Sequence, residues 1–238
     1  MGLNVLLHGD GGQSFFDFPN QAVQQNLMGV VVLAPNEDLF WGGGSGLDRT
    51  DGVAHSAAVN KLIQDVLPQT VSFSKSNVFF TGVSGGSLTL SGFFVPQFMT
   101  QYKTGVLLNC GALTPQVDFQ DTANTLSVTR IHYQSTQNEL ALLQPAIPEA
   151  IKAIESAATD AGISTQTISK LQTVDNSVTG GHCEFDGQDF VSGVQLMADS
   201  FASVMQTGGS GLVDGIGNVK QFLCALCPST SSCITPVF

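Results

Sequence analysis

The sequence GVSGG at residues 82–86 constrains the fold more than any other feature of this chain. An apolar run at residues 78–81 leads directly into it, and a helix-like segment follows. A serine in so sharp a strand-to-helix turn adopts strained backbone angles, and the residues two positions to either side must be small to avoid collisions. Gly82 and Gly86 meet this requirement. The pattern therefore favours an exposed serine nucleophile, Ser84, over a glycine-rich turn that happens to contain serine.

Short apolar runs alternate along the chain with segments of helical periodicity. The runs are strand-sized and rich in Val, Leu, Ile and Phe, as expected of strands buried on both faces of a parallel sheet. They cover residues 4–8, 29–34, 77–81, 105–109 and 127–133. The helical segments cover residues 53–66, 147–158 and 190–205, and Asp51 is placed to cap the first of them. This alternation predicts a doubly wound α/β sheet of mostly parallel strands.

Chain length and hydrophobic content fit one domain. The chain has 238 residues, of which 42% are hydrophobic, and it shows no internal repeat and no linker. That is enough for one sizeable core. We expect a single domain over residues 1–238, in which a glycine-rich loop at residues 208–217 leads to a cysteine-bearing tail.

The charge of the chain argues against several kinds of partner. The formal net charge is −11, and the 8 basic residues are scattered. Such a surface repels nucleic-acid phosphates and anionic membrane surfaces. No apolar stretch approaches the ~18–20 residues that a membrane-spanning helix needs. We expect a monomer that binds neither nucleic acid nor membrane.

The amino terminus and the cysteines bear on where the protein works. Met1 leads directly into a strand pattern without a signal peptide, so the chain is either cytosolic or a mature form with a new start methionine. Scarce lysine, abundant serine and threonine, and a tail that carries Cys224, Cys227 and Cys233 favour secretion. A tail disulfide is favoured over a metal site, because zinc needs four ligands and no histidine lies nearby. With five cysteines, at least one is free or pairs with another chain.

A second glycine-rich turn, HGDGG at residues 8–12, follows the first predicted strand. Such a turn can aim free backbone N–H groups at an oxyanion, each contributing roughly 3–4 kcal/mol of transition-state stabilisation. We expect one donor to be the N–H of Gly85 and the other the N–H of Asp10 or Gly11, with His8 bracing the loop. Alone, the motif fits an ordinary strand-ending turn equally well, and the downstream serine motif favours the oxyanion hole.

One of the four histidines is placed to act as a general base. In an α/β enzyme with a serine nucleophile, the order along the chain is serine, acid, histidine, and the histidine lies on the loop after the last strand. His182, in a flexible turn near the carboxyl end, fits this position. The others belong to the glycine-rich turn, a helical segment and a strand pattern: His8, His55 and His132.

Two carboxylates compete for the position of the acid. Glu139 lies in the loop after the predicted strand at residues 127–133, and Asp175 lies seven residues before His182 and could reach it across its own loop. We favour Glu139, with Asp175 as the alternative, and either could instead be a solvated surface group. The resulting set predicts two-step acyl transfer, in which His182 deprotonates Ser84 and later activates a water.

Together these motifs resemble those of fungal secreted α/β-hydrolases, a group that includes feruloyl and acetylxylan esterases and polyhydroxybutyrate depolymerases. The resemblance rests on residues 8–12, WGGG at residues 41–44 with Asp48 and Asp51, residues 82–86 and residues 181–183. It implies the α/β-hydrolase fold in a minimal, cutinase-sized form, carboxylic-ester hydrolysis and no cofactor or metal. The chain departs from the usual pattern at the acid, where Asn138 next to Glu139 replaces the expected aspartate.

The resemblance also bears on two cysteines. In this fold the loops that carry Cys110 and Cys183 converge above the nucleophile. That convergence implies a disulfide between them, which would fix the histidine loop. Two buried free thiols are the alternative.

Aromatic residues near the motifs bear on the substrate. Trp41 is flanked by glycines and is our candidate substrate contact, whereas the three phenylalanines within residues 15–18 are more often core than pocket. We expect a serine esterase that acts on plant-wall or polyester-type esters. A serine peptidase or thioesterase with the same residues, and a catalytically silent binding protein of the same fold, are the alternatives.

Overall fold

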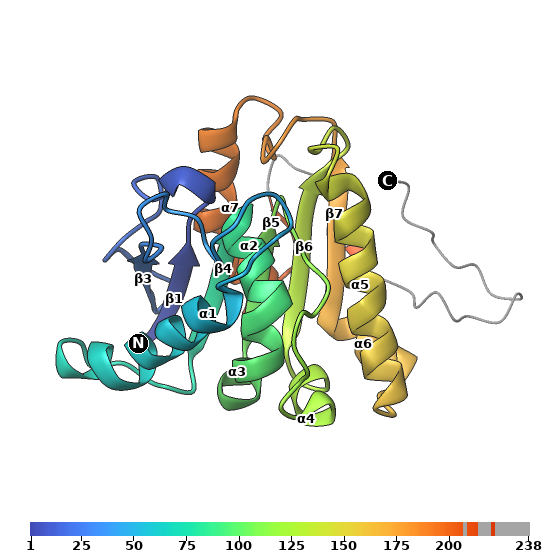
Figure 1. The fold of residues 1–238 in the computed structure, drawn as a ribbon, viewed down its shortest axis with the longest axis horizontal. Coiled ribbons are helices and arrows are strands. Elements are labelled where there is room, and N and C mark those ends of the chain that lie inside the picture. The colour runs from blue at the N-terminus through green and yellow to red at the C-terminus, as the bar shows by residue number, and fades with distance from the viewer. Residues whose placement is uncertain (207–208, 214–219, 222–238) are drawn as a thin grey trace, which may run out of the picture.

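A central sheet of eight strands runs through the part of the chain that the computed structural model describes, residues 1–206, 209–213 and 220–221 (Figure 1). The strands lie in the order β2-β3-β1-β4-β5-β6-β7-β8. Those from β3 to β7 are parallel, and β2 and β8 pair antiparallel at the edges. Their bounds are β1 (Gly2–Leu7), β2 (Val23–Gln24), β3 (Leu27–Val32), β4 (Val78–Val83), β5 (Gly105–Asn109), β6 (Arg130–Thr136), β7 (Gln172–Val178) and β8 (Lys220–Gln221). The prediction of a doubly wound, mostly parallel sheet is confirmed.

Helices cover both faces of the sheet. In Figure 1, α1, α3 and α5 lie in front of the strands and α7 lies behind them. The helices are α1 (Gly52–Lys61), α2 (Gly85–Thr89), α3 (Val95–Tyr102), α4 (Thr122–Leu126), α5 (Leu143–Asp160), α6 (Thr165–Leu171) and α7 (Phe190–Met205). This layering separates the buried apolar side chains into two cores, one on each face of the sheet.

Strand β4 shows why the apolar runs predict strands correctly. Phe80 packs on the front face, where its ring centroid lies 5.0 Å from that of Tyr102 in α3. Phe79 points to the opposite face and contacts Phe201 of α7 at 5.5 Å. Because successive strand side chains point to opposite faces, a strand with helices on both sides is apolar throughout.

Several predicted elements are confirmed with their bounds. Strand β5 covers the predicted residues 105–109, and α7 covers 190–205. The helix predicted at residues 53–66 is α1 together with a wider helical turn that continues to Val66. Asp51 is the N-cap residue of α1, as predicted, but its side chain makes no capping hydrogen bond.

The sequence pattern is wrong about the start of β6 and does not predict β7. Strand β6 begins at Arg130 rather than at residue 127, because the preceding residues close α4. The N–H of Ser127 donates to the Ala123 carbonyl at 3.1 Å. Strand β7 is missed because its sequence, QTVDNSV, is largely polar and lacks the apolar run that marks the other parallel strands.

Most of the predicted tail lies outside the described residues. Only residues 209–213 of the loop predicted at residues 208–217 are described, and the tail cysteines Cys224, Cys227 and Cys233 lie outside. Among the helices that the structure describes, none is long and apolar enough to cross a membrane.

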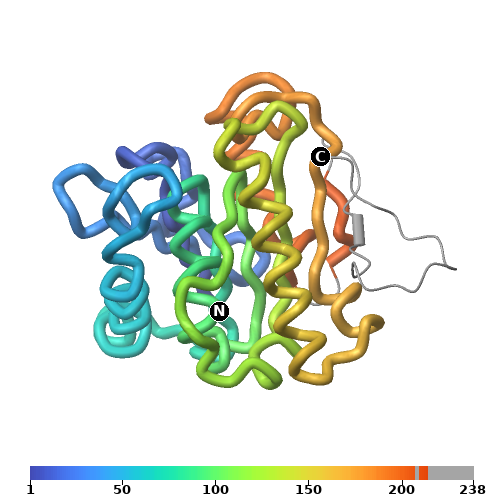
Figure 2. Tube along the Cα trace, turned by 45° about the vertical axis from the view of Figure 1, so that its right-hand side comes forward, coloured from blue at the N-terminus to red at the C-terminus, as the bar shows by residue number. Residues whose placement is uncertain are grey.

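The carboxyl ends of the parallel strands meet at one edge of the sheet, at the top in Figures 1 and 2. The segments that follow β6 and β7 lie side by side there (Figure 2). A hydrogen bond of 2.8 Å from the Gln137 N–H to the Val178 carbonyl joins them. In open α/β sheets this edge is where ligands bind.

Candidate active site

Ser84 occupies a sharp turn between β4 and α2. Its backbone angles, φ 49° and ψ −115°, lie in a region that L-residues rarely adopt. A Cβ on Gly82 would lie 2.6 Å from the Ser87 nitrogen, and one on Gly86 would lie 2.4 Å from the Leu7 carbonyl oxygen. The two glycines are therefore required by close backbone approach. The strand-to-helix turn that the GVSGG motif predicts, called the elbow below, is present at residues 82–86.

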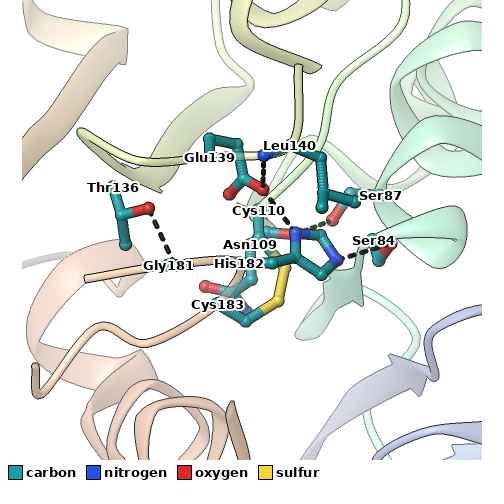
Figure 3. The surroundings of a disulfide bond; sticks show 10 residues. All are labelled: Ser84, Ser87, Asn109, Cys110, Thr136, Glu139, Leu140, Gly181, His182 and Cys183. Carbon is teal, nitrogen blue, oxygen red and sulfur yellow. Dashed lines mark hydrogen bonds and ion pairs between the residues drawn. A yellow bond between two sulfur atoms is a disulfide. The ribbon is translucent and has the colours of Figure 1, made fainter. Parts of the chain in front are cut away.

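His182 lies within hydrogen-bonding distance of Ser84 and Glu139 (Figure 3). Its Nε2 is 3.1 Å from Ser84 Oγ, and its Nδ1 is hydrogen-bonded to Glu139 Oε1. Ionised Glu139 can only accept, so Nδ1 carries a proton and Nε2 is free to accept the Ser84 hydroxyl. The histidine side chain is 18% exposed and that of Glu139 is 2% exposed. The hydrogen-bonded chain thus runs from a buried acid to an accessible serine.

Two short contacts hold Glu139 in place. Its Oε1 also accepts the N–H of Leu140 at 2.8 Å, and its carbonyl accepts from the Gln144 side chain at 2.8 Å. Asn138 is tied to the next loop, because its N–H donates to the Gly180 carbonyl at 3.3 Å.

Asp175, the alternative acid, lies elsewhere. It is a buried residue within β7, and its Oδ1 accepts the N–H of Ser177 at 2.8 Å. Among the described contacts, none joins Asp175 to His182. The structure brings Glu139 to the histidine and does not bring Asp175 there.

The glycine-rich turn after β1 lies beside the elbow. A Cβ on Gly85 would lie 1.9 Å from Asp10 Oδ1, and one on Gly9 would lie 3.6 Å from Ser84 Cβ. The N–H of Gly11 donates to the Leu39 carbonyl at 3.1 Å, so it is engaged. The N–H groups of Asp10 and Gly85 donate to no backbone oxygen of another element in the described part of the chain. Of the two sequence alternatives, Asp10 is therefore the residue whose N–H is available beside Gly85.

His8 anchors this turn. Its Nε2 accepts the Ala34 N–H at 3.0 Å, which leaves Nδ1 to donate to the Gly9 carbonyl at 2.6 Å. Burial lowers the pKa of His8, which favours the neutral ring that these two bonds require. His8 therefore has the bracing position expected from the sequence.

Trp41 does not contact the site, and its prediction as a substrate contact is corrected. The residue is 1% exposed, and its ring packs against His8 at 5.7 Å and His55 at 6.0 Å. The glycines that follow it, Gly42 and Gly43, have φ values of 78° and 64°, and the loop they form does not expose the ring. The ring belongs to the core.

The nearby phenylalanines have different environments. Phe18 is buried, and Phe15 packs edge-on against His8 with a centroid distance of 6.0 Å. Phe16 is 93% exposed. The ring of Phe190, the first residue of α7, lies 5.9 Å from that of His182.

Cys110 and Cys183 form a disulfide directly beneath the histidine (Figure 3). Both residues are fully buried, and the prediction of this pairing is confirmed. In the described residues these two cysteines and His182 form the one cluster dense enough to hold a metal ion. Sulfurs joined in a disulfide lack the thiolate that binds metals, so this cluster is not a metal site.

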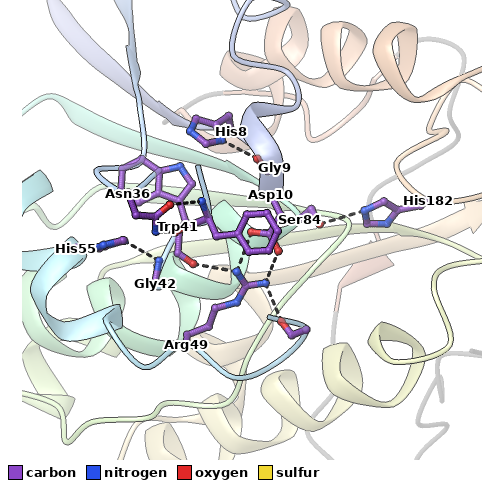
Figure 4. A network of polar contacts seen from close by, with 12 residues as sticks. His8, Gly9, Asp10, Asn36, Trp41, Gly42, Arg49, His55, Ser84 and His182 are labelled. Atoms are coloured by element: carbon purple, nitrogen blue, oxygen red, sulfur yellow. Dashed lines mark hydrogen bonds and ion pairs between the residues drawn. The ribbon is translucent and has the colours of Figure 1, made fainter. Parts of the chain in front are cut away.

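Sequence reasoning missed Arg49. Its guanidinium pairs with Asp10 through two bonds, Nη1 to Oδ1 at 2.8 Å and Nη2 to Oδ2 at 2.7 Å (Figure 4). Arg49 is one of two arginines in the chain and follows the WGGG loop. The signal available in the sequence was a rare arginine shortly after a glycine-rich loop.

Comparisons with known proteins identify the fold. No protein-family model and no curated protein matches the chain. Solved structures do match, among them Arabidopsis thaliana SOBER1, with a TM-score of 0.53 and 15% identity over 83% of this chain and 97% of that one. A Bacillus cereus carboxylesterase matches with a TM-score of 0.50 and 14% identity over 83% and 87%. YahD, solved with malic acid, matches with a TM-score of 0.56 and 12% identity over 87% of this chain and 94% of that one. The chain has the α/β-hydrolase fold.

Proposed function

We propose that this chain is a serine carboxylic-ester hydrolase with Ser84 as nucleophile, His182 as general base and Glu139 as acid. The observation that carries the proposal is the hydrogen-bonded chain from Ser84 Oγ through His182 to Glu139, at the carboxyl edge of the sheet. The presence of a carboxylesterase among the solved structures with this fold supports it.

The first step acylates the serine. His182 Nε2 takes the hydroxyl proton as Ser84 Oγ attacks the ester carbonyl carbon. The carbonyl oxygen becomes an oxyanion, which accepts hydrogen bonds from the N–H groups of Asp10 and Gly85 in this proposal. When the tetrahedral intermediate collapses, the C–O bond to the alcohol breaks, and the protonated His182 gives its proton to that oxygen.

The second step returns the enzyme to its starting state. A water replaces the alcohol, and His182 Nε2 takes its proton while the oxygen attacks the acyl carbon. Collapse of the second intermediate releases the carboxylic acid and returns the proton to Ser84 Oγ. Throughout, Glu139 holds the proton-bearing Nδ1 and stabilises the imidazolium that forms transiently.

For the substrate, we propose esters of the plant-wall or polyester type. Exposed apolar side chains on the loops that carry the site support an apolar acyl or aromatic group. They include Phe16 at 93% and Leu140 at 44% exposure. We also propose that the protein is secreted, since a disulfide persists best in an oxidising compartment.

The test uses a fluorophosphonate probe, which modifies activated serines. We expect the wild type to be labelled and to hydrolyse short-chain nitrophenyl esters, and Ser84→Ala to do neither. Ser76→Ala, which removes an exposed serine hydroxyl in the turn before β4, is the control and should behave as wild type. Equal labelling of wild type and Ser84→Ala, or no labelling of either, contradicts the proposal and leaves a binding protein as the explanation.

A substrate panel then separates the remaining enzyme classes. Methyl ferulate, acetylated xylan, a soluble polyester, an acyl thioester and a peptide are compared by kcat/KM. The proposal requires an oxygen ester to be the best substrate. A peptide or thioester turned over faster than every oxygen ester would instead make the chain a peptidase or thioesterase.

A further inference from the structure

Arg49 is a buried cation with a bidentate partner at the edge of the proposed active site. Its side chain is 1% exposed, and that of Asp10 is 25% exposed. Two parallel N–H···O bonds join them, at 2.8 and 2.7 Å. Such a fork-to-carboxylate pair fixes the orientation of both groups, because each bond constrains the other.

The guanidinium is itself held by the loop on which it lies. Nη1 also donates to the Trp41 carbonyl at 3.0 Å, and Nη2 to the Gly46 carbonyl at 2.7 Å. The loop is anchored in turn, because the Gly42 N–H donates to His55 Nδ1 at 2.8 Å. Arg49 therefore connects a fixed loop to Asp10 (Figure 4).

Asp10 has two parts with opposite effects on the oxyanion. Its backbone N–H is the donor available beside Gly85, whereas its carboxylate Oδ1 would lie 1.9 Å from a Cβ on Gly85. A negative charge packed against Gly85, whose N–H is the other proposed donor, opposes the build-up of an oxyanion there. The bidentate cation compensates that charge and pulls the carboxylate toward the loop.

We infer that Arg49 is a positioning residue for the oxyanion hole, acting through Asp10. It orients the Asp10 N–H and neutralises the Asp10 carboxylate. The turn after β1 then supplies a hydrogen-bond donor to the oxyanion without an uncompensated negative charge beside it. The inference rests on the proposed function, because an oxyanion forms only if Ser84 attacks a carbonyl. Arg49 does not touch the substrate and is not a catalytic residue.

The main test compares Arg49→Met with the double variant Arg49→Met/Asp10→Asn. Methionine keeps much of the apolar stem and removes the charge. We expect Arg49→Met to lower kcat by ~10–100-fold, less than or similar to the ~10²–10³-fold loss on removing an oxyanion donor, with KM changed little. The double variant lacks the uncompensated carboxylate, so it should turn over several-fold faster than Arg49→Met.

Inhibition by phenylboronic acid supplies a readout that a purely structural role would not move. The boronate adduct with Ser84 is tetrahedral and anionic, so its affinity reports the oxyanion hole. The inhibition constant should rise in Arg49→Met, because the affinity falls, and should return toward the wild-type value in the double variant, in parallel with kcat/KM. If the Arg49–Asp10 pair serves stability alone, Arg49→Met should have a lower Tm. Its kcat and its inhibition constant should then stay within ~2-fold of wild type after correction for the folded fraction.

Two further variants keep the test decisive. Arg49→Lys retains a cation but cannot form the fork, so an intermediate kcat is expected, and this variant replaces Arg49→Met if the latter does not fold. Arg130→Met is the matched control, since Arg130 is the other arginine, half-buried at the amino end of β6 and bonded to the Gln206 carbonyl. It should leave kcat unchanged.

The outcomes separate the two proposals. A wild type without turnover or fluorophosphonate labelling overturns the proposed function, and this inference with it. An active wild type with Arg49→Met or Arg49→Lys at wild-type kcat, or a double variant no faster than Arg49→Met, overturns only the role of Arg49.

Discussion

The carboxylate of Glu139 accepts a hydrogen bond from Nδ1 of His182, although 43 residues separate them in the chain. They lie on the loops after β6 and β7, which are adjacent parallel strands. The Asn138 N–H donates to the Gly180 carbonyl at 3.3 Å, so the two loops are also bonded to each other. The sheet and this bridge together set the distance between acid and histidine.

Glu139→Gln should lower kcat by up to ~10⁴-fold, because an amide can donate to Nδ1 and then favours the wrong tautomer. Asp175→Asn should change kcat by less than ~3-fold, because its bond to the Ser177 N–H survives in the amide. Steady-state kinetics on a nitrophenyl ester checks both, with circular dichroism as the folding control. A larger loss in Asp175→Asn than in Glu139→Gln would assign the acid to Asp175.

The disulfide leads to a second prediction. It joins Cys183, the neighbour of His182, to Cys110 at the end of β5, and 73 residues separate the two cysteines. Cys110→Ala/Cys183→Ala should lower the free energy of unfolding by ~2–4 kcal/mol, typical for a disulfide. It should also lower kcat, because the histidine loop loses an anchor. Urea unfolding and kinetics measure the two effects, and reduction of the wild type, verified by thiol titration, should reproduce them. Unchanged activity after that reduction would remove any role in holding the histidine.

The residues that local sequence identifies best are those whose chemistry depends on short-range geometry. Gly82 and Gly86 are required within a single turn, so the elbow can be predicted from the local sequence without knowledge of the fold. His182 follows from chain order, and Glu139 follows from chain order and from the predicted strand that precedes its loop. The sequence favours Glu139 but leaves Asp175 open as the alternative, because excluding it depends on β7, whose polar sequence does not reveal the strand that buries Asp175.

Features that depend on long-range packing escape the sequence. Trp41 is followed by three glycines, which suggests exposure, yet the ring is buried in the core. Arg49 and Asp10 are 39 residues apart, and their pairing follows from the path of the loop after β3. The local sequence does not specify either relationship, because each is decided by which segments the sheet brings together.

The burial of Trp41 leads to a third prediction. Trp41→Phe should lower the free energy of unfolding by ~1–2 kcal/mol, a fraction of the ~3–5 kcal/mol typical of truncating a buried tryptophan to alanine. KM for nitrophenyl esters should stay within ~2-fold, because the ring does not face the site. Phe16→Ala is the comparison, since that side chain is exposed and its loss should leave stability unchanged. A rise in KM for Trp41→Phe without loss of stability would restore Trp41 as a substrate contact.

Glu155 of α5 makes stability depend on pH. It is buried, its Oε1 has no hydrogen-bond partner in the described part of the chain, and burial raises its pKa to about 7. Between pH 4.5, which is the ordinary pKa of this carboxyl, and about pH 7, the folded state keeps Glu155 protonated, whereas the unfolded state releases the proton. Stability from this group is fully present below pH 4.5 and is lost as the pH rises toward 7.

Glu155→Gln should remove this loss, because glutamine stays neutral. We compare the unfolding free energy of the variant with that of the wild type at each pH. This difference should be ~2–3 kcal/mol more favourable to the variant at pH 8 than at pH 4.5, at about 1.4 kcal/mol per pKa unit. Buried His132, whose pKa burial lowers to about 4, has the opposite slope, since it loses stability as the pH falls below 6.5. That slope is common to both proteins and cancels in the comparison. Urea unfolding at the two pH values measures the effect, and Glu149→Gln on the exposed side of the same helix is the control. Equal differences at pH 4.5 and pH 8 for Glu155→Gln would mean that this carboxyl titrates normally in the folded protein.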